Sequence, residues 1–380
     1  MLLRSQLPGP RVWVLVVLSL VAGSEWVLRQ SDEYGRIIPT LADPRLGWIK
    51  APGRHVINKE GRAFRTNALG YRDRYWAPPA APELPVTQGG QAGLRVAVFG
   101  DSMTHGPGCE EADLWPRQLE VSLQAAAPER EVLVMNFAVV GYVFEQMVRI
   151  WEDYAHAWKP DLVIICVNAW SARPMRFLEP LPGGPLAKWL RSTAIYNRLQ
   201  RFPREEASRR TMTWAPGRIG DGRSQSELEK QMRKTPLREA YTAYWGELLT
   251  RLQRLNDEVE EQGGQLILLS IPRLEAIAGD HSRWSSDRWD GYADEVGARH
   301  FNLLPSFQEG MAEILAEAEA HGGIRKFFGA RAGDAAQRQL VKAPTSLYRF
   351  SDPEHLAARG HRLVAQELLS TVQELFSCAD

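Results

Sequence analysis

Residues 94–102 read LRVAVFGDS, and this stretch is the clearest indication of the fold class in the sequence. Leu94–Phe99 is a short apolar run of the length and composition typical of a buried strand, and Gly100 ends it. Three further runs of the same kind predict strands at Val132–Phe137, Leu162–Val167 and Gln265–Ile271. Runs that are apolar throughout are typical of strands buried on both faces, so the sequence predicts a parallel sheet covered by helices.

Segments with apolar residues at helical spacing lie between and after these strands. The predicted helices are 114–127, 143–158, 237–262 and 356–376. Strands that alternate with helices predict one α/β domain over 94–376, and no linker divides the pattern into two. Outside its core we expect an irregular N-terminal extension over 29–93, an insertion with one or two helices at 171–260, and a second insertion at 310–345.

The composition of the 380 residues excludes several classes of protein. Apolar residues make up 44%, which is enough for a full core and argues against wholesale disorder. The 46 basic and 46 acidic residues leave no basic excess to neutralise nucleic-acid phosphates, so no nucleic-acid partner is expected. Cys109, Cys166 and Cys378 form neither a disulfide framework nor a metal-ligand spacing. No histidine pair or carboxylate cluster suggests a metal, so no cofactor is expected.

Residues 1–28 predict an export segment. Arg4 and Arg11 precede an unbroken apolar run from Val12 to Ala22. The run is shorter than the roughly 20 residues of an ordinary spanning helix, and it suits the apolar region of a signal peptide. Ala22-Gly23-Ser24 offers a cleavage site; alternatively, Val12–Leu28 remains as a short uncleaved anchor in the membrane. Both alternatives predict export of the body to the periplasm or to the extracytoplasmic face of the membrane.

Polar residues follow the predicted strands at the ends where ligands of a parallel sheet bind. Ser102 follows the first strand, Gly141 the second and Asn168 the third, and Asp352-Pro353-Glu354-His355 precedes the last helix. This set, in this order and beside these elements, resembles the conserved blocks of the SGNH, or GDSL, hydrolase family.

The resemblance covers residues 94–170, 262–305 and 345–376. It implies the flavodoxin-like three-layer α/β/α sandwich of SGNH hydrolases, with a parallel sheet and helical insertions. Thr66–Asp73, which reads TNALGYRD, also resembles a stretch found upstream of the Gly-Asp-Ser block in exported bacterial members.

The resemblance implies a catalytic triad of Ser102, Asp352 and His355. A serine hydroxyl is a weak nucleophile, and His355 would take its proton and later return it to the leaving group. Asp352 would hold the imidazole by its other nitrogen and stabilise the imidazolium. Attack on a carbonyl builds negative charge on oxygen, and the implied oxyanion hole consists of the Ser102 N–H, the Gly141 N–H and the Asn168 side-chain amide.

The individual residues of these blocks also have physical interpretations of their own. Gly141 suits a backbone that approaches the substrate closely with no Cβ in the way. Asn168 departs from the family pattern, which has glycine before and aspartate after the asparagine, whereas this chain has Val167 and Ala169. The alternative for Asn168 is therefore a structural loop amide, and the alternative for Asp352 is a helix cap.

Histidines and tryptophans near these blocks have less specific interpretations. We expect His105 at the rim of a pocket, and His361 at a helix surface or in a local hydrogen bond. Trp284 and Trp289 lie in a polar stretch, where their rings either stack on sugars or pack against the domain.

The resemblance implies a serine esterase that hydrolyses carboxylic esters, in particular O-acetyl esters of a carbohydrate or lipid, through an acyl-enzyme at Ser102. The same chemistry permits an O-acyltransferase acting on a cell-envelope polysaccharide, because the acceptor is whichever hydroxyl reaches the site. An inactive SGNH-fold binding protein is the third alternative, and the altered block around Asn168 supports it. The expected partners are an acylated small molecule or glycan, and the membrane if the N-terminal segment is uncleaved.

Overall fold

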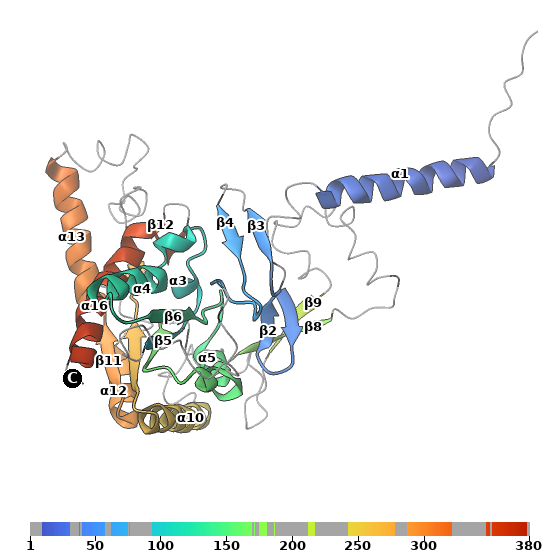
Figure 1. Cartoon of the computed structure of the whole chain (residues 1–380). Coiled ribbons are helices and arrows are strands. Elements are labelled where there is room, and N and C mark those ends of the chain that lie inside the picture. Colours follow the sequence, from blue (N-terminus) through green and yellow to red (C-terminus); the bar gives the residue numbers. More distant parts are fainter. Residues whose placement is uncertain are drawn as a thin grey trace, which may run out of the picture.

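Five parallel strands form the central sheet of the chain (Figure 1). They are β5 (Leu94–Phe99), β6 (Val132–Asn136), β7 (Leu162–Val167), β10 (Gln265–Ser270) and β11 (Arg299–Asn302). The computed structural model describes residues 10–30, 38, 40–57, 62–74, 76, 93–168, 171, 175–180, 186, 212–216, 242–277, 287–320, 347–349 and 352–377. The sheet order is β6-β5-β7-β10-β11, and every neighbouring pair is parallel. This is the 2-1-3-4-5 order of flavodoxin-like folds.

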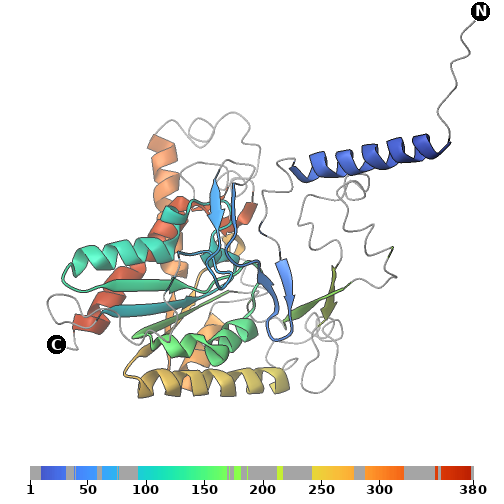
Figure 2. The same ribbon diagram turned by 45° about the vertical axis from the view of Figure 1, so that its right-hand side comes forward.

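Helices cover both faces of the sheet, which confirms the predicted three-layer α/β/α sandwich. One face carries α4 (Trp115–Ala126), α13 (Leu304–Ala320) and α16 (Ala358–Ser377), and the other carries α5 (Phe144–Asp153), α10 (Thr242–Glu261) and α12 (Asp287–Val296). Figure 2 shows α4 above the sheet and α5 and α10 below it.

Successive side chains of β5 enter the two cores alternately. Val96 and Val98 pack in the core shared with α4 and α16, whereas Ala97 and Phe99 pack in the core shared with α5 and α10. All four side chains are fully buried. The unbroken apolar run therefore serves two cores at once, as expected for a central parallel strand.

The edge strand β11 is the one strand of the central sheet that the sequence does not predict. Arg299–Asn302 reads RHFN, and its side chains are exposed or half-buried. The strand pairs with β10 on one side only, so it lacks the continuous apolar pattern of the buried strands.

The four predicted helices are present as α4, α5, α10 and α16. The helix expected over 143–158 divides, because α5 ends at Asp153 and a separate 3₁₀ helix, η2, covers Ala155–Trp158. Lys159, which follows η2, has a left-handed backbone with φ of 47° that ends the turn before β7.

Part of the N-terminal extension is regular, so the expectation of a wholly irregular segment is wrong within the described residues. It forms two hairpins, β1 (Thr40–Asp43) with β2 (Gly47–Lys50), and β3 (His55–Ile57) with β4 (Ala63–Arg65). The first hairpin docks on the segment after β6: the Tyr142 hydroxyl donates to the Trp48 carbonyl oxygen at 2.9 Å, and the Gln146 amide donates to the Leu46 carbonyl oxygen at 2.6 Å. Short strands of three or four residues leave no long periodic pattern in the sequence.

The insertions are described only in part. Within the described residues of the first, β8 (Arg176–Pro180) pairs antiparallel with β9 (Met212–Pro216). Most of the residues between these strands lie outside the described part, so the one or two helices expected in this insertion stay a prediction. Of the second, α13 extends to Ala320, and residues 321–346 lie outside the described part.

Short elements complete the domain. They are α3 (Ser102–His105), η1 (Glu111–Asp113), α11 (Leu274–Ile277), β12 (Tyr348–Arg349) and β13 (Asp352–Leu356). The last two pair as an antiparallel ribbon just before α16.

The predicted export segment forms the helix α1 (Pro10–Gln30), which lies apart from the sheet in Figures 1 and 2. Its apolar side chains are exposed, including Trp13 at 53% and Leu20 at 65%. Among the helices in the described ranges, none has both the length and the apolar character needed to cross a membrane. The export function of this segment stays a prediction.

Candidate active site

The carboxyl ends of β5 and β7 lie side by side at the centre of the sheet. From β5 the chain passes to β6 on one side of the sheet, and from β7 it passes to β10 on the other side. The topological switch point therefore lies between β5 and β7. Ser102 follows β5, and Asn168 follows β7 directly. Two of the predicted site residues therefore flank the position where folds of this order bind ligands.

Ser102 is the first residue of the one-turn helix α3. Asp101 caps this turn, because its side chain accepts a 2.8 Å hydrogen bond from the Met103 N–H. Gly106 ends the turn with φ of 65°, and its N–H donates to the Ser102 carbonyl oxygen at 3.0 Å. A Cβ at position 106 would lie 2.2 Å from Cδ2 of Leu114, so both the backbone conformation and the space require glycine.

Asp101 and Asn168 join the ends of the two strands. Nδ2 of Asn168 donates a 2.6 Å hydrogen bond to Oδ2 of Asp101, and both side chains are buried. Burial raises the pKa of the Asp101 carboxyl, while the bonds from Asn168 and Met103 act in the opposite direction. His355 also acts to lower the Asp101 pKa, so His355 lies within electrostatic range of this carboxyl.

The hydrogen bond of the Asn168 side chain to Asp101 supports the interpretation of Asn168 as a structural loop amide. The backbone N–H of Asn168 also donates to the Ser171 hydroxyl at 3.0 Å, which fixes the loop. The predicted role of Asn168 as an oxyanion donor stays a prediction.

Gly141 is an exposed residue in the otherwise largely buried segment between β6 and α5, and its backbone is left-handed with φ of 83°. A Cβ built at this position would lie 3.5 Å from Cζ2 of Trp48, an ordinary contact distance. The left-handed backbone therefore accounts for a glycine at position 141. Clearance for substrate stays a second, predicted reason. The Gly141 N–H as an oxyanion donor stays a prediction.

His355 lies on β13, and this strand contacts the helix α3 that begins with Ser102. A further link comes from Cys109, whose thiol donates to the Leu356 carbonyl oxygen at 3.5 Å. Asp352 lies on the same strand by its backbone, and its side chain is outside the described part. The triad of Ser102, Asp352 and His355 stays a prediction. The elements that carry its nucleophile and base, α3 and β13, are in contact.

The alternative that Asp352 caps the last helix is wrong, because α16 begins only at Ala358. In the ribbon of β12 and β13, Tyr348 pairs with Leu356 and Arg349 with Asp352, so the register shifts between these two pairs.

Two histidines predicted at surfaces are buried. His105 is 6% exposed rather than at a pocket rim, and burial lowers its pKa well below the usual value. His361 is fully buried, and its Nδ1 accepts a 3.4 Å hydrogen bond from the Trp115 N–H, so it is neither at the helix surface nor locally bonded. Burial lowers the His361 pKa to about 3.

Trp289 packs inside the domain and does not offer its ring to a sugar. It is 4% exposed, and its ring centroid lies 5.3 Å from that of Phe144 and 5.7 Å from that of Tyr292. Trp284 lies outside the described residues. The sugar-stacking interpretation of Trp289 is therefore wrong.

The segment Thr66–Trp76 carries buried charged groups to which the sequence motifs assign no role. The Asp73 carboxyl accepts hydrogen bonds from the N–H of Asn136 at 2.9 Å and from the Trp76 indole at 3.1 Å. Burial raises the Asp73 pKa to about 7. Arg72 is 1% exposed and binds the loop after Ser102. The signal in the sequence is an arginine and an aspartate between Tyr71 and Trp76, inside a stretch that resembles a family feature.

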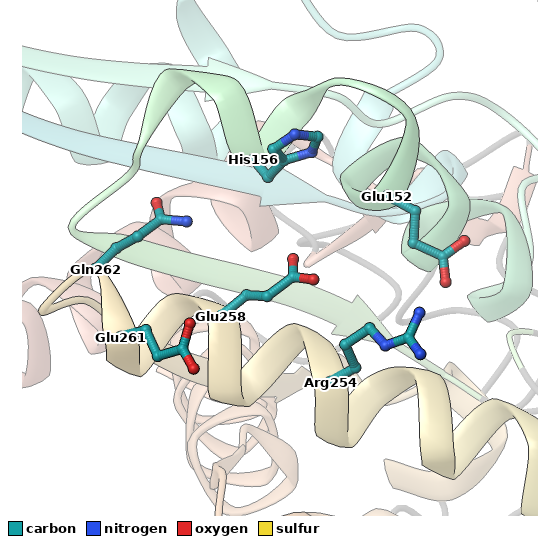
Figure 3. Close-up of a pocket in the computed structure, with 6 residues that line it drawn as sticks. All are labelled: Glu152, His156, Arg254, Glu258, Glu261 and Gln262. Carbon is teal, nitrogen blue, oxygen red and sulfur yellow. The ribbon is translucent and has the colours of Figure 1, made fainter.

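A polar pocket of about 410 Å³ lies between α5–η2 and α10 (Figure 3). His156 and Gln262 lie shortly before β7 and β10, so this pocket is near the amino ends of the strands and away from Ser102. Glu258 accepts a 2.8 Å hydrogen bond from the Trp151 indole, and Glu152 pairs with Arg251. The Glu152 and Glu258 carboxylates therefore serve contacts between α5 and α10.

Comparisons with known proteins give similarity of fold only. No protein-family model and no curated protein matches the chain. Among solved structures, it is similar to an acetylxylan esterase from Geobacillus stearothermophilus, with 16% identity, a TM-score of 0.35, and coverage of 73% of this chain and 94% of the other. It is also similar to a psychrotrophic esterase from Pseudoalteromonas sp., with 10% identity, a TM-score of 0.35, and coverage of 74% and 98%. At these scores the function has to be inferred from the chain's own residues.

Proposed function

We propose that the protein is a serine esterase of the SGNH type with Ser102 as its nucleophile. One observation carries this proposal: Ser102 begins a capped turn at the switch point of a 2-1-3-4-5 sheet, next to the asparagine that follows β7. Ligands of such sheets bind at this position. The strand that carries His355 contacts the same turn, which supports His355 as the base.

In the proposed mechanism, His355 takes the proton of the Ser102 hydroxyl as its oxygen attacks the ester carbonyl. The negative charge that forms on the carbonyl oxygen is stabilised by the N–H groups of Ser102 and Gly141 and by the Asn168 amide. His355 then gives the proton to the leaving alcohol, and the acyl group remains on Ser102. Water, activated by His355, hydrolyses this acyl-enzyme, and Asp352 orients the imidazole throughout.

The Ser102 N–H lies in the first turn of α3, where backbone N–H groups have no partner within the helix. This supports its use as an oxyanion donor. The proposed substrates are O-acetyl or other carboxylic esters of a carbohydrate or lipid, as the sequence resemblance implies. We further propose that residues 1–28 direct the chain to the extracytoplasmic side of the membrane.

The test is hydrolysis of 4-nitrophenyl acetate by the purified chain and by Ser102→Ala. The chain is expected to release 4-nitrophenol and the variant to lose turnover at least about 10³-fold, since removal of a serine nucleophile can cost about 10⁶-fold in kcat. Ser306→Ala is the matched control, because Ser306 is a half-buried serine on α13 that hydrogen-bonds Glu367 at 2.8 Å. Equal turnover by the chain and by Ser102→Ala would overturn the proposal. A folded chain without turnover would favour a binding protein.

A further inference from the structure

Arg72 lies buried beneath the loop that follows Ser102. Nη1 donates hydrogen bonds to the carbonyl oxygens of His105 at 2.8 Å and of Gly106 at 2.5 Å. Nη2 donates to the Cys109 carbonyl oxygen at 2.6 Å. Although Arg72 belongs to the N-terminal extension, its three hydrogen bonds go to the last residue of α3 and to the loop that follows it.

This loop leads to both members of the proposed nucleophile–base pair. The Gly106 oxygen binds Arg72, and the Gly106 N–H donates to the Ser102 carbonyl oxygen at 3.0 Å. The Cys109 oxygen also binds Arg72, and the Cys109 thiol donates to the Leu356 carbonyl oxygen at 3.5 Å, one residue after His355. Two short chains of hydrogen bonds therefore run from one guanidinium to the turn of Ser102 and to the strand of His355.

The contacts of Arg72 suit positioning better than simple stabilisation. Burial lowers the guanidinium pKa to about 10, so Arg72 remains charged at neutral pH. Its Cζ lies 3.7 Å from the centroid of the Phe64 ring, and its hydrogen bonds go to carbonyl oxygens rather than to a carboxylate. A charge buried this way is costly to desolvate, whereas the rigid, planar fork fixes three oxygens in one arrangement.

We infer that Arg72 is a positioning residue that holds Ser102 and His355 in their reacting arrangement. This inference rests on the proposed esterase function. It predicts that the loss of Arg72 slows the chemical step and leaves substrate binding nearly unchanged, because Arg72 is too deeply buried to touch substrate. A lysine at this position keeps the charge but cannot bind the three carbonyl oxygens as a planar fork does.

The experiment compares Arg72→Met and Arg72→Lys with the parent chain. The kcat for 4-nitrophenyl acetate is expected to fall about 10- to 100-fold in both variants, with KM changing less than about threefold, as for displaced catalytic groups. Arg65→Met is the matched control: Arg65 is on the same extension and pairs with Glu111 at 2.5 Å, but its side chain is 50% exposed. Its kcat is expected to stay within about twofold of the parent value.

A second readout does not depend on turnover. Hydrogen exchange followed by mass spectrometry is expected to show faster exchange in peptides covering 102–109 and 352–356 in Arg72→Met, and no change there in Arg65→Met. Should the parent chain lack esterase activity, the proposed function fails while this measurement still tests the placement of the two segments by Arg72.

Each result either supports or overturns the inference. A folded Arg72→Met with the parent kcat, or with unchanged exchange in both segments, overturns it. Should Arg72→Met fail to fold, Arg72→Lys decides: a native melting curve with reduced kcat supports positioning. A folded Arg72→Lys with the parent kcat overturns the inference. Failure of both variants to fold also overturns it, because Arg72 would then be a residue required for stability.

Discussion

The Asn168 amide donates a 2.6 Å hydrogen bond to the Asp101 carboxylate, and this bond ties the carboxyl end of β7 to that of β5. Asp101 at the same time caps the turn that begins with Ser102. The neighbours of Asn168, Val167 and Ala169, differ from the family pattern. Asn168 itself nevertheless binds Asp101, the residue directly before the proposed nucleophile Ser102. The bond fixes the plane of the amide, which is what an oxyanion donor requires before substrate arrives.

Asn168→Ala is expected to lower kcat for an acetyl ester by about 10²–10³-fold, because one oxyanion donor is lost. It also leaves the buried Asp101 without that hydrogen bond, so the free energy of unfolding is expected to fall by about 1–3 kcal/mol. Steady-state kinetics and urea denaturation measure the two effects.

Asn256→Ala separates catalysis from stability in this comparison. Asn256 is also buried, and its amide donates to the Val296 carbonyl oxygen at 3.2 Å on the far side of the sheet from α3 and β13. We expect it to destabilise the fold while kcat stays at the parent value. An equal loss of kcat in both asparagine variants would remove Asn168 from the oxyanion hole.

Gly141→Ala is expected to lower the free energy of unfolding by about 1–2 kcal/mol, because alanine at φ of 83° is strained although its Cβ has room. Relief of this strain would turn the N–H away from the oxyanion, so kcat is expected to fall as well. Gly263→Ala is the matched control, with φ of 79° and open space around its Cβ, in the turn before β10. It should show the same loss of stability with unchanged kcat; unchanged kcat in both variants would exclude the Gly141 N–H.

The sequence predicts the sheet because each central strand serves two cores, and this leaves an unbroken apolar run such as Leu162–Val167. The edge strand β11 and the hairpins of the N-terminal extension leave no such signal, because they are short and partly exposed. For the same reason the docking of the first hairpin on the segment after β6 could not be foreseen.

The candidate site shows the same division. The blocks around Ser102 and Asn168 follow strands, so their approach to one another follows from the strand order. The contact of Asn168 with Asp101 and the contacts of Arg72 join residues far apart in the chain, and spacing alone does not reveal them. The burial of His361 does not follow from the sequence either. His361 lies in the first turns of α16, and its contact with Trp115, far away in the chain, places it on the buried face of this helix.

His361 is expected to make the folded chain less stable in acid. Burial holds its folded-state pKa at about 3, below the ordinary value of about 6.5. Between these values the unfolded chain binds a proton that the folded chain does not, so the stabilisation is complete above pH 6.5 and is lost as the pH falls toward 3. One such proton contributes a slope of about 1.4 kcal/mol per pH unit.

His361→Gln removes this titrating group, so its free energy of unfolding should fall less than that of the parent between pH 7 and pH 4. Asp73, whose folded pKa of about 7 gives the opposite slope in this range, is present in both proteins and cancels from the difference. Parallel pH profiles of the two proteins, obtained from urea denaturation, would contradict the buried neutral state of His361.

Residues 1–37 are expected to export a reporter phosphatase that is active only outside the cytoplasm. The apolar run Val12–Ala22 is the feature that directs export, so Leu18→Arg in this fusion should abolish phosphatase activity. Activity without dependence on Leu18, or none in the unaltered fusion, would contradict the predicted localisation.

If Ser102 is an activated nucleophile, the folded chain should be labelled covalently at this residue by a 4-nitrophenyl phosphonate. Such a reagent phosphonylates a serine whose base and oxyanion hole are in place, as the serine oxygen bonds to phosphorus and 4-nitrophenolate leaves. Peptide mass spectrometry is predicted to find one stoichiometric adduct, on Ser102, and to find it greatly reduced in His355→Ala. A folded chain that remains unlabelled, or an adduct on another residue that persists in Ser102→Ala, would contradict the claim.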